Sequence, residues 1–193
     1  MTLIEKTKVR AVREAKSLLQ IFGYNGFSFQ KLADRLGIKQ PSLYGHFQSK
    51  EYLGQVLIDD YMSRFQDWTE TISVFGPQEK LGALFELFVK FSSDDRKVCP
   101  LSGILADFNS LPKKLHKPAL KATQLHINWI QDVITEGQSK NIFRKDLSAE
   151  DLANFVVSAG FGAQLISKAF GDPEKIRGVK LSVMKFLETS ATH

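Results

Sequence analysis

Residues 28–50 read Ser-Phe-Gln-Lys-Leu-Ala-Asp-Arg-Leu-Gly-Ile-Lys-Gln-Pro-Ser-Leu-Tyr-Gly-His-Phe-Gln-Ser-Lys, and this stretch decides the fold. Its apolar residues recur at three- and four-residue steps from Phe29 to Leu36, so they line one face of a short helix. Ser28 can cap the start of this helix, because a hydroxyl oxygen accepts a hydrogen bond from an otherwise unpaired backbone amide. Gly37 can close it, because glycine enters the left-handed conformation at little cost.

A second helix is expected after a short turn that Ile38 anchors in the core. Pro41 suits its first turn, where the missing N–H costs nothing, and Leu43 and Phe47 point inward, four residues apart. The remaining positions carry donors, acceptors and a cation on the outside: Lys39, Gln40, Ser42, Tyr44, Gly45 and His46. Two short helices of this kind predict a helix-turn-helix, whose second helix lies in the major groove of DNA and reads base edges.

The stretch resembles the DNA-binding domain of the tetracycline-repressor (TetR) family of bacterial regulators. The marks that carry the resemblance match in order and spacing over about fifty residues: Gly23 and Gly26, Leu32-Ala33-Leu36-Gly37, Leu43-Tyr44-His46-Phe47, and Lys50. Gly45 departs from the pattern, since relatives usually carry a bulkier residue that faces the DNA there. We therefore expect little readout from position 45.

The surplus of positive over negative charge lies in the same part of the chain. The 193 residues carry a formal net charge of +5. Residues 1–50 hold nine Lys and Arg against three Asp and Glu, whereas residues 51–193 hold seventeen against eighteen. This surplus is expected where phosphates are bound, and a solvated basic face is the alternative. The single cysteine suits a reducing cytoplasm, and the sequence shows neither a signal peptide nor an apolar run long enough to span a membrane.

Helical periodicity continues to the end of the chain, and no β pattern or internal repeat is evident. We therefore predict an all-α fold with a three-helix DNA-binding domain at residues 1–49 and a helical effector-binding and dimerisation domain at residues 50–193. The expected helices cover, approximately, 2–22 (opened by a capping box at Thr2–Glu5), 28–37, 41–47, 50–73, 77–92, 99–109, 148–170 and 173–188. Another long helix is expected to follow the break at Leu111-Pro112, most securely over 118–140.

The last two helices are unusually apolar for surface elements, and the resemblance implies that they pair across a two-fold axis. A palindromic operator supports this independently, because it needs two recognition helices about one DNA turn apart. The alternative is that these helices fill a monomer core. Five residues are the expected dimer contacts: Phe155, Ala159, Gly162, Val183 and Phe186.

The middle helices are expected to enclose an aromatic-rich pocket for a small hydrophobic or aromatic effector. The candidate lining residues are Phe88, Leu105, Phe108, His126, Trp129 and Gln164. Core packing is the alternative for each of them, because an aromatic stripe at helical spacing is common in ordinary cores. Asp107 and His126 are the titratable groups nearest to this pocket, and exposure to solvent is the alternative for both.

The sequence thus predicts a dimeric regulator, a repressor that a small molecule releases from a palindromic operator. Nine residues are the expected DNA contacts: Ser28, Gln30, Lys39, Gln40, Ser42, Leu43, Tyr44, His46 and Lys50. The alternatives are a nonspecific architectural DNA-binding protein and a redox-responsive regulator that acts through Cys99, which precedes a helix and follows two cations. We expect no enzyme, no cofactor and no metal, because the sequence shows no nucleophile elbow, phosphate loop or clustered metal ligands. No membrane partner is expected either.

Overall fold

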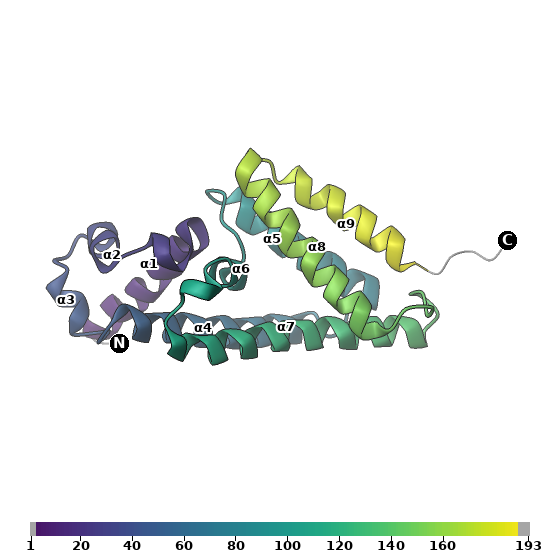
Figure 1. Ribbon diagram of the computed structural model, residues 1–193, viewed down its shortest axis with the longest axis horizontal. Coiled ribbons are helices and arrows are strands. Elements are labelled where there is room, and N and C mark those ends of the chain that lie inside the picture. Colours follow the sequence, from purple (N-terminus) through teal and green to yellow (C-terminus); the bar gives the residue numbers. More distant parts are fainter. Residues whose placement is uncertain (1–2, 189–193) are drawn as a thin grey trace. The chain divides into compact units, whose positions relative to one another are not determined.

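A computed structural model describes residues 3–188, and within that range the chain is helical, with one isolated β-bridge between Phe143 and Glu188 (Figure 1). The elements are α1 (Leu3–Gly26), α2 (Phe29–Leu36), α3 (Pro41–Tyr44), α4 (Lys50–Thr71), α5 (Pro77–Ser93), α6 (Pro100–Leu105), the 3₁₀ turn η1 (Phe108–Ser110), α7 (Lys113–Ser139), α8 (Ala149–Phe170) and α9 (Glu174–Leu187). The predicted all-α fold is confirmed. The capping box proposed at Thr2–Glu5 begins outside the described residues.

Most helix boundaries lie close to the predicted ones, but α1 extends to Gly26 and α3 ends at Tyr44. The helix expected at 99–109 ends at Leu105, and η1 follows it. The long helix expected after the Leu111–Pro112 break begins at Lys113, so Pro118 lies inside α7. Pro118 has no N–H to donate to the Lys114 carbonyl, so α7 lacks one backbone hydrogen bond in its second turn.

The chain forms two compact units that do not follow its linear order. Unit 1 comprises residues 1–65 and 100–122, and unit 2 comprises residues 66–99 and 123–193. In unit 1, α1 packs against α2 and α6; in unit 2, α5, α8 and α9 pack on one another. The segment 100–122 therefore belongs to the same unit as the helix-turn-helix, where α6 packs on α1, although it follows that motif by about fifty residues.

The core of unit 1 forms under the helix-turn-helix. Leu32, Leu43 and Phe47 have no exposed surface, and Phe27 is 1% exposed. The side chains that the sequence placed inward therefore hold the two short helices together, since burying each large apolar side chain contributes roughly 1.5–3 kcal/mol.

In unit 2, two ion pairs join neighbouring helices, and one aromatic ring packs directly on a glycine. The Lys80 ammonium contacts the Glu136 carboxylate at 2.7 Å, joining α5 to α7, and Lys180 contacts Glu86 at 2.8 Å, joining α9 to α5. The fully buried Phe143 ring lies directly on Gly137, where a β-carbon would overlap it. Glycine is therefore required at position 137, because no side chain fits beneath the ring.

Candidate nucleic-acid interface

The first helix of the motif is fixed at both ends as its sequence indicates. The Ser28 hydroxyl accepts a hydrogen bond from the Lys31 amide at 3.2 Å. Gly37 adopts the left-handed conformation with φ of 68°, and its N–H caps the helix at Ala33 and Asp34. These two devices set where α2 starts and stops, and hence where the chain turns towards α3.

The second helix is shorter than predicted. It runs from Pro41 to Tyr44, and the amides of His46 and Phe47 both donate to the Leu43 carbonyl, at 2.9 and 2.8 Å. Gly45 sits at the point where the helix ends, consistent with its low helix propensity. The chain therefore continues as a tight turn, which still carries Phe47 into the core.

The expected DNA contacts are mostly solvent-accessible. Lys39, Ser42 and Tyr44 are exposed, and Gln40 and His46 are half-buried. The Tyr44 ring rests on Phe29 with the ring centroids 5.1 Å apart and keeps 53% of its surface exposed. The tyrosine is therefore held on an apolar base while much of its side chain remains accessible.

One residue on the predicted contact list is placed inside. Leu43 has no exposed surface, so its side chain packs in the core and cannot reach DNA. Gln30 is exposed on α2, and its amide donates to the Asp34 carboxylate at 2.7 Å, an i,i+4 pair on the helix surface.

Lys50 lies in an aromatic environment at the start of α4. Its ammonium lies 4.6 Å from the centroid of the Tyr24 ring and 5.0 Å from that of Phe27. Burial lowers the pKa of Lys50, and the nearby Asp107 carboxylate opposes that change. The ammonium thus joins the end of α1 to the start of α4, a structural role that spacing alone did not indicate.

Asp107 also binds the end of α1, and the sequence did not predict this contact. Its carboxylate accepts a hydrogen bond from the Asn25 amide at 2.9 Å, and the Asn25 side chain donates to the Ser110 hydroxyl at 2.5 Å. Gly23 has φ of 74°, and a β-carbon there would lie 2.7 Å from the carboxylate. Gly23 was the feature of the sequence that could have indicated this close contact, but by itself it predicted only a turn.

The residues proposed for the effector pocket divide between the two units. Phe108 stacks on His116 in unit 1, with the ring centroids 4.7 Å apart, and Leu105 is half-buried in the same unit. In unit 2, His126 packs between Phe88 and Phe161, with centroid distances of 6.3 and 5.5 Å.

The other two pocket candidates also lie in unit 2. Trp129 contacts Trp68 at a centroid distance of 5.5 Å. Gln164 has no exposed surface, and its side-chain oxygen accepts a hydrogen bond from the Cys99 backbone amide at 2.5 Å. Cys99 itself is 2% exposed, so its thiol is shielded from solvent.

The expected dimer contacts divide in a similar way. Phe155 and Phe186 are 41% and 40% exposed, Ala159 is half-buried, and Gly162 is exposed. Val183 is only 1% exposed within the chain itself. Its side chain therefore belongs to the core of unit 2, and its inclusion among the dimer contacts was wrong.

Two family models match the chain. The model described as bacterial regulatory proteins, tetR family, matches residues 11–55, and the tetracyclin repressor-like C-terminal domain matches residues 77–182. The chain belongs to the TetR family. Members of this family are DNA-binding transcriptional regulators, so this protein is a regulator and not an enzyme.

Relatives in this family include named repressors. The HTH-type transcriptional repressor DhaR of a Mycobacterium species is 26% identical over 150 residues, covering 76% of this chain and 74% of DhaR. The class A tetracycline repressor from transposon 1721 of Escherichia coli is 41% identical over 59 residues, covering 31% of this chain and 26% of that protein.

Solved TetR-family structures share the fold. A regulator from Agrobacterium tumefaciens superposes with a TM-score of 0.90 at 18% identity, covering 96% of this chain and all of that one. A regulator from Legionella pneumophila superposes with a TM-score of 0.82 at 28% identity, covering 93% of this chain and 96% of that one.

The described residues show neither a candidate membrane span nor a candidate metal site. Within residues 3–188 no helix is long and apolar enough to cross a membrane. In the same range no three His, Cys, Asp or Glu side chains are grouped so that they could hold a metal ion.

Proposed function

We propose that this TetR-family regulator is a homodimeric repressor that binds a palindromic operator and is released by a small hydrophobic or aromatic molecule. The proposal rests on the accessibility of four polar side chains around the buried Leu43: Lys39, Gln40, Ser42 and Tyr44. An amide, a hydroxyl and a phenol held on a rigid base suit hydrogen bonding to base edges in the major groove. The named repressors among the relatives favour repression over activation.

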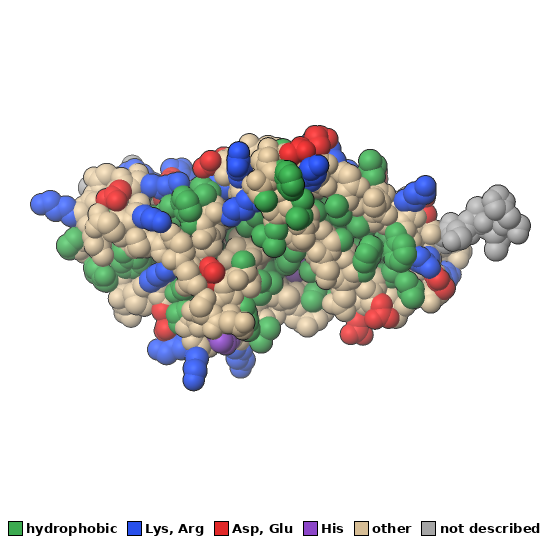
Figure 2. Space-filling view, turned by 45° about the horizontal axis from the view of Figure 1, so that its top comes forward, with side chains coloured by type: hydrophobic (Ala, Val, Ile, Leu, Met, Phe, Trp, Pro, Cys, Tyr) green, Lys and Arg blue, Asp and Glu red, His purple; other side chains and the backbone are tan. Residues whose placement is uncertain are grey.

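Dimerisation is supported by the apolar surface of α8 and α9. Besides Phe155 and Phe186, several large apolar side chains are exposed there: Leu165, Ile166, Phe170 and Leu181. Figure 2 shows hydrophobic side chains at the surface of the part of the molecule that these helices form. Exposed apolar surface of this extent on one pair of helices is typical of a protein interface.

Gly162 adds a second argument for a helix–helix interface. A β-carbon built at this position would meet no atom within 4 Å, so packing inside the chain does not require glycine there. Glycine inside a helix costs about 1 kcal/mol relative to alanine. Close approach of a partner helix explains why the position nevertheless lacks a side chain.

The effector proposal rests on the aromatic cluster of unit 2. His126 is 1% exposed, and burial lowers its pKa to about 3, so the imidazole is neutral at pH 7. A neutral imidazole among Phe88 and Phe161 favours an uncharged, apolar or aromatic ligand over an anionic one. We propose that the ligand enters beside this cluster and Trp129, and that Leu105 and Phe108 belong to unit 1 rather than to the pocket.

Release requires that the effector discriminate between two conformations. It must bind more tightly to a conformation in which the two recognition helices are wrongly separated for successive major grooves. A ligand with equal affinity for both conformations would leave operator binding unchanged.

Base reading is tested by Gln40→Ala. We expect a loss of roughly 1–3 kcal/mol at one base pair of an operator selected from random duplexes, with relaxed preference at that position. Titration of DNA binding by fluorescence anisotropy on the selected duplex and on base-pair variants gives both quantities. An equal loss on random DNA would refute base reading by Gln40 and favour a nonspecific DNA-binding protein.

The dimer is tested by Ala159→Asp, with Leu120→Asp, an exposed position of unit 1, as the matched control. A carboxylate at the centre of an apolar interface would be buried without a partner, so we expect monomers and weaker operator binding. Light scattering at micromolar concentration measures the mass. A wild-type monomer that still binds a palindrome tightly would contradict the proposal.

The effector site is tested by tryptophan fluorescence during a screen of hydrophobic compounds. Because Trp68 and Trp129 are in contact, the screen needs the variants Trp68→Phe and Trp129→Phe. Quenching that persists in Trp68→Phe, disappears in Trp129→Phe and accompanies operator release is the expected result. Operator release without any change in Trp129 emission would place the site elsewhere.

A further inference from the structure

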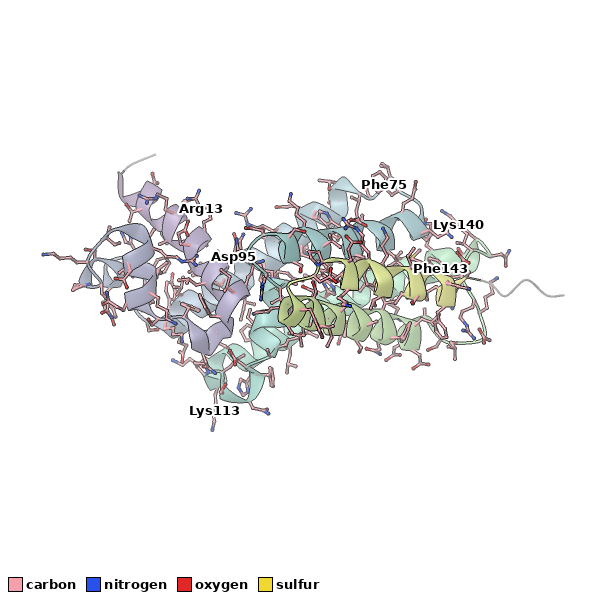
Figure 3. The ribbon with its side chains drawn as sticks, turned by 90° about the horizontal axis from the view of Figure 1, so that it is seen from above. Arg13, Phe75, Asp95, Lys113, Lys140 and Phe143 are labelled. Carbon is pink, nitrogen blue, oxygen red and sulfur yellow. The ribbon has the colours of Figure 1, made fainter. Side chains whose placement is uncertain are left out.

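The first three turns of α7 carry a dense group of positive charges. Lys113, Lys114, Lys117 and Lys121 are all exposed, and the sequence from residue 108 to 131 contains no Asp or Glu. Figure 3 shows Lys113 projecting from the start of the helix into open space. These four residues are called the α7 lysine cluster below.

This arrangement is unfavourable for the helix itself. Lys113, Lys117 and Lys121 are spaced at i, i+4 and i+8, so like charges face one another along one stripe. The first lysines also lie at the amino-terminal end of a helix, where the backbone dipole disfavours cations. Among these four lysines of the described chain, only Lys114 forms an ion pair, with Glu51 at 3.4 Å, and the Lys114 side chain is 85% exposed. Packing and local electrostatics therefore do not account for the cluster.

The cluster lies beside the residues that follow the recognition helix. A groove of about 310 Å³ is lined by Lys114 and Leu115 together with Gln48, Ser49 and Tyr52, among others. Leu115 also packs so closely on α4 that a β-carbon at Gly54 would lie 2.7 Å from it. The start of α7 is therefore adjacent to the junction between α3 and α4, within a single compact unit.

The charge of the compact units agrees with a nucleic-acid role. Unit 1 contains fourteen Lys and Arg against seven Asp and Glu, whereas unit 2 contains twelve against fourteen. Segment 100–122 contributes four lysines and one acid to unit 1. The basic surplus is thus not restricted to residues 1–50, as the linear sequence suggested; it extends to the segment that belongs to the same unit as the helix-turn-helix.

We propose that Lys113, Lys114 and Lys117 of the α7 lysine cluster contact the phosphate backbone of DNA that flanks the operator bases read by α3. The proposal rests on operator binding by the helix-turn-helix. The amino-terminal end of α4 attracts a phosphate through its free amides and dipole, and a strand passing it runs next to the groove that Lys114 lines. Lys113, Lys114 and Lys117 lie at the end of α7 that lines this groove, whereas Lys121 lies about 12 Å further along the helix from Lys113.

The test compares two DNA lengths. The double variant Lys113→Gln/Lys117→Gln and the wild type are titrated against a selected operator cut at its outermost specified base pair, and against the same operator with about ten extra base pairs on each side. Each titration is repeated over a series of salt concentrations. On the long duplex we expect the slope of log K against log salt to fall by about 0.9 for each lysine that loses a phosphate. On the short duplex the two proteins should bind alike.

The controls separate the flank contact from other effects. Lys121→Gln, and Lys90→Gln in unit 2, should bind both duplexes as the wild type does. The double variant should not melt at a lower temperature than the wild type, because its substitutions remove repulsion between like charges. Equal slopes for wild type and double variant on the long duplex would overturn the proposal, as would an equal loss on both duplexes. Unchanged DNA binding with loss of an acidic protein partner would also overturn it. Absence of any operator preference in the wild type would instead refute the proposed function.

Discussion

His126 makes the stability of the protein sensitive to pH in a defined direction. The imidazole is 1% exposed, and burial lowers its pKa from 6.5 to about 3. In the unfolded chain the same group takes up a proton near its ordinary pKa. Between these two values the unfolded state binds more protons than the folded state, so the free energy of unfolding falls as the pH falls.

The magnitude follows from the two pKa values. At pH 7 both states are largely neutral at His126, and its contribution is close to zero. At pH 5 the unfolded state is protonated and the folded state is not, which lowers the free energy of unfolding by about 2 kcal/mol relative to pH 7. The loss should continue towards pH 3 and stop below it.

Urea unfolding at pH 7, 6 and 5, at one protein concentration, measures this effect. His126→Gln supplies a neutral side chain with no pKa in the range, and we expect it to remove most of the pH dependence. Its stability at pH 7 is expected to be lower than that of the wild type, because the contacts with Phe88 and Phe161 are lost. A variant that keeps the full slope between pH 7 and 5 would refute the assignment to His126.

Three further predictions concern the packing of each unit. Asp107→Ala should lower the free energy of unfolding by roughly 1–2 kcal/mol by removing the hydrogen bond to the Asn25 amide, and Asp107→Asn should recover part of the loss in the same thermal melts. Lys50→Gln should lower the free energy of unfolding by about 0.5–1 kcal/mol, because the contacts with Tyr24 and Phe27 are lost. It should also reduce the salt dependence of DNA binding by about one charge. An unchanged salt dependence would mean that Lys50 has the structural role alone. Gly137→Ala should destabilise by roughly 1–3 kcal/mol because Phe143 occupies the space, whereas Gly162→Ala, in open space, should raise the stability of the monomer.

The local structure of the motif was predictable because its signals are short-range. The Ser28 cap and the left-handed Gly37 depend on residues three or four positions away, and both appear as expected. The inward orientation of Phe47 also follows from its spacing to Leu43. Such features require no knowledge of what the rest of the chain does.

The tertiary grouping of residues was not predictable from the same patterns. Asp107 was expected near a ligand pocket, yet it binds the end of α1. Periodicity identifies Phe108 as apolar but cannot indicate that its ring stacks on His116 rather than joining the cluster around His126. The prediction of a dimer contact at Val183 was wrong for the same reason. An apolar position on a helix faces either the core of its own chain or a partner, and the local sequence does not distinguish the two.

Segment 100–122 has a consequence for the modularity of this protein. It falls inside the matched C-terminal family domain, residues 77–182, but it belongs to the compact unit that contains the helix-turn-helix. A β-carbon at Gly103 would lie 2.9 Å from the Leu19 carbonyl, so α6 and α1 fit each other closely. A chimera that joined residues 1–55 to the effector-binding domain of another regulator would keep the helix-turn-helix. It would lose segment 100–122, against which α1 packs. Exchange of specificities between such proteins therefore has to transfer two separate stretches of chain together, and a recombination event at a single junction would separate them.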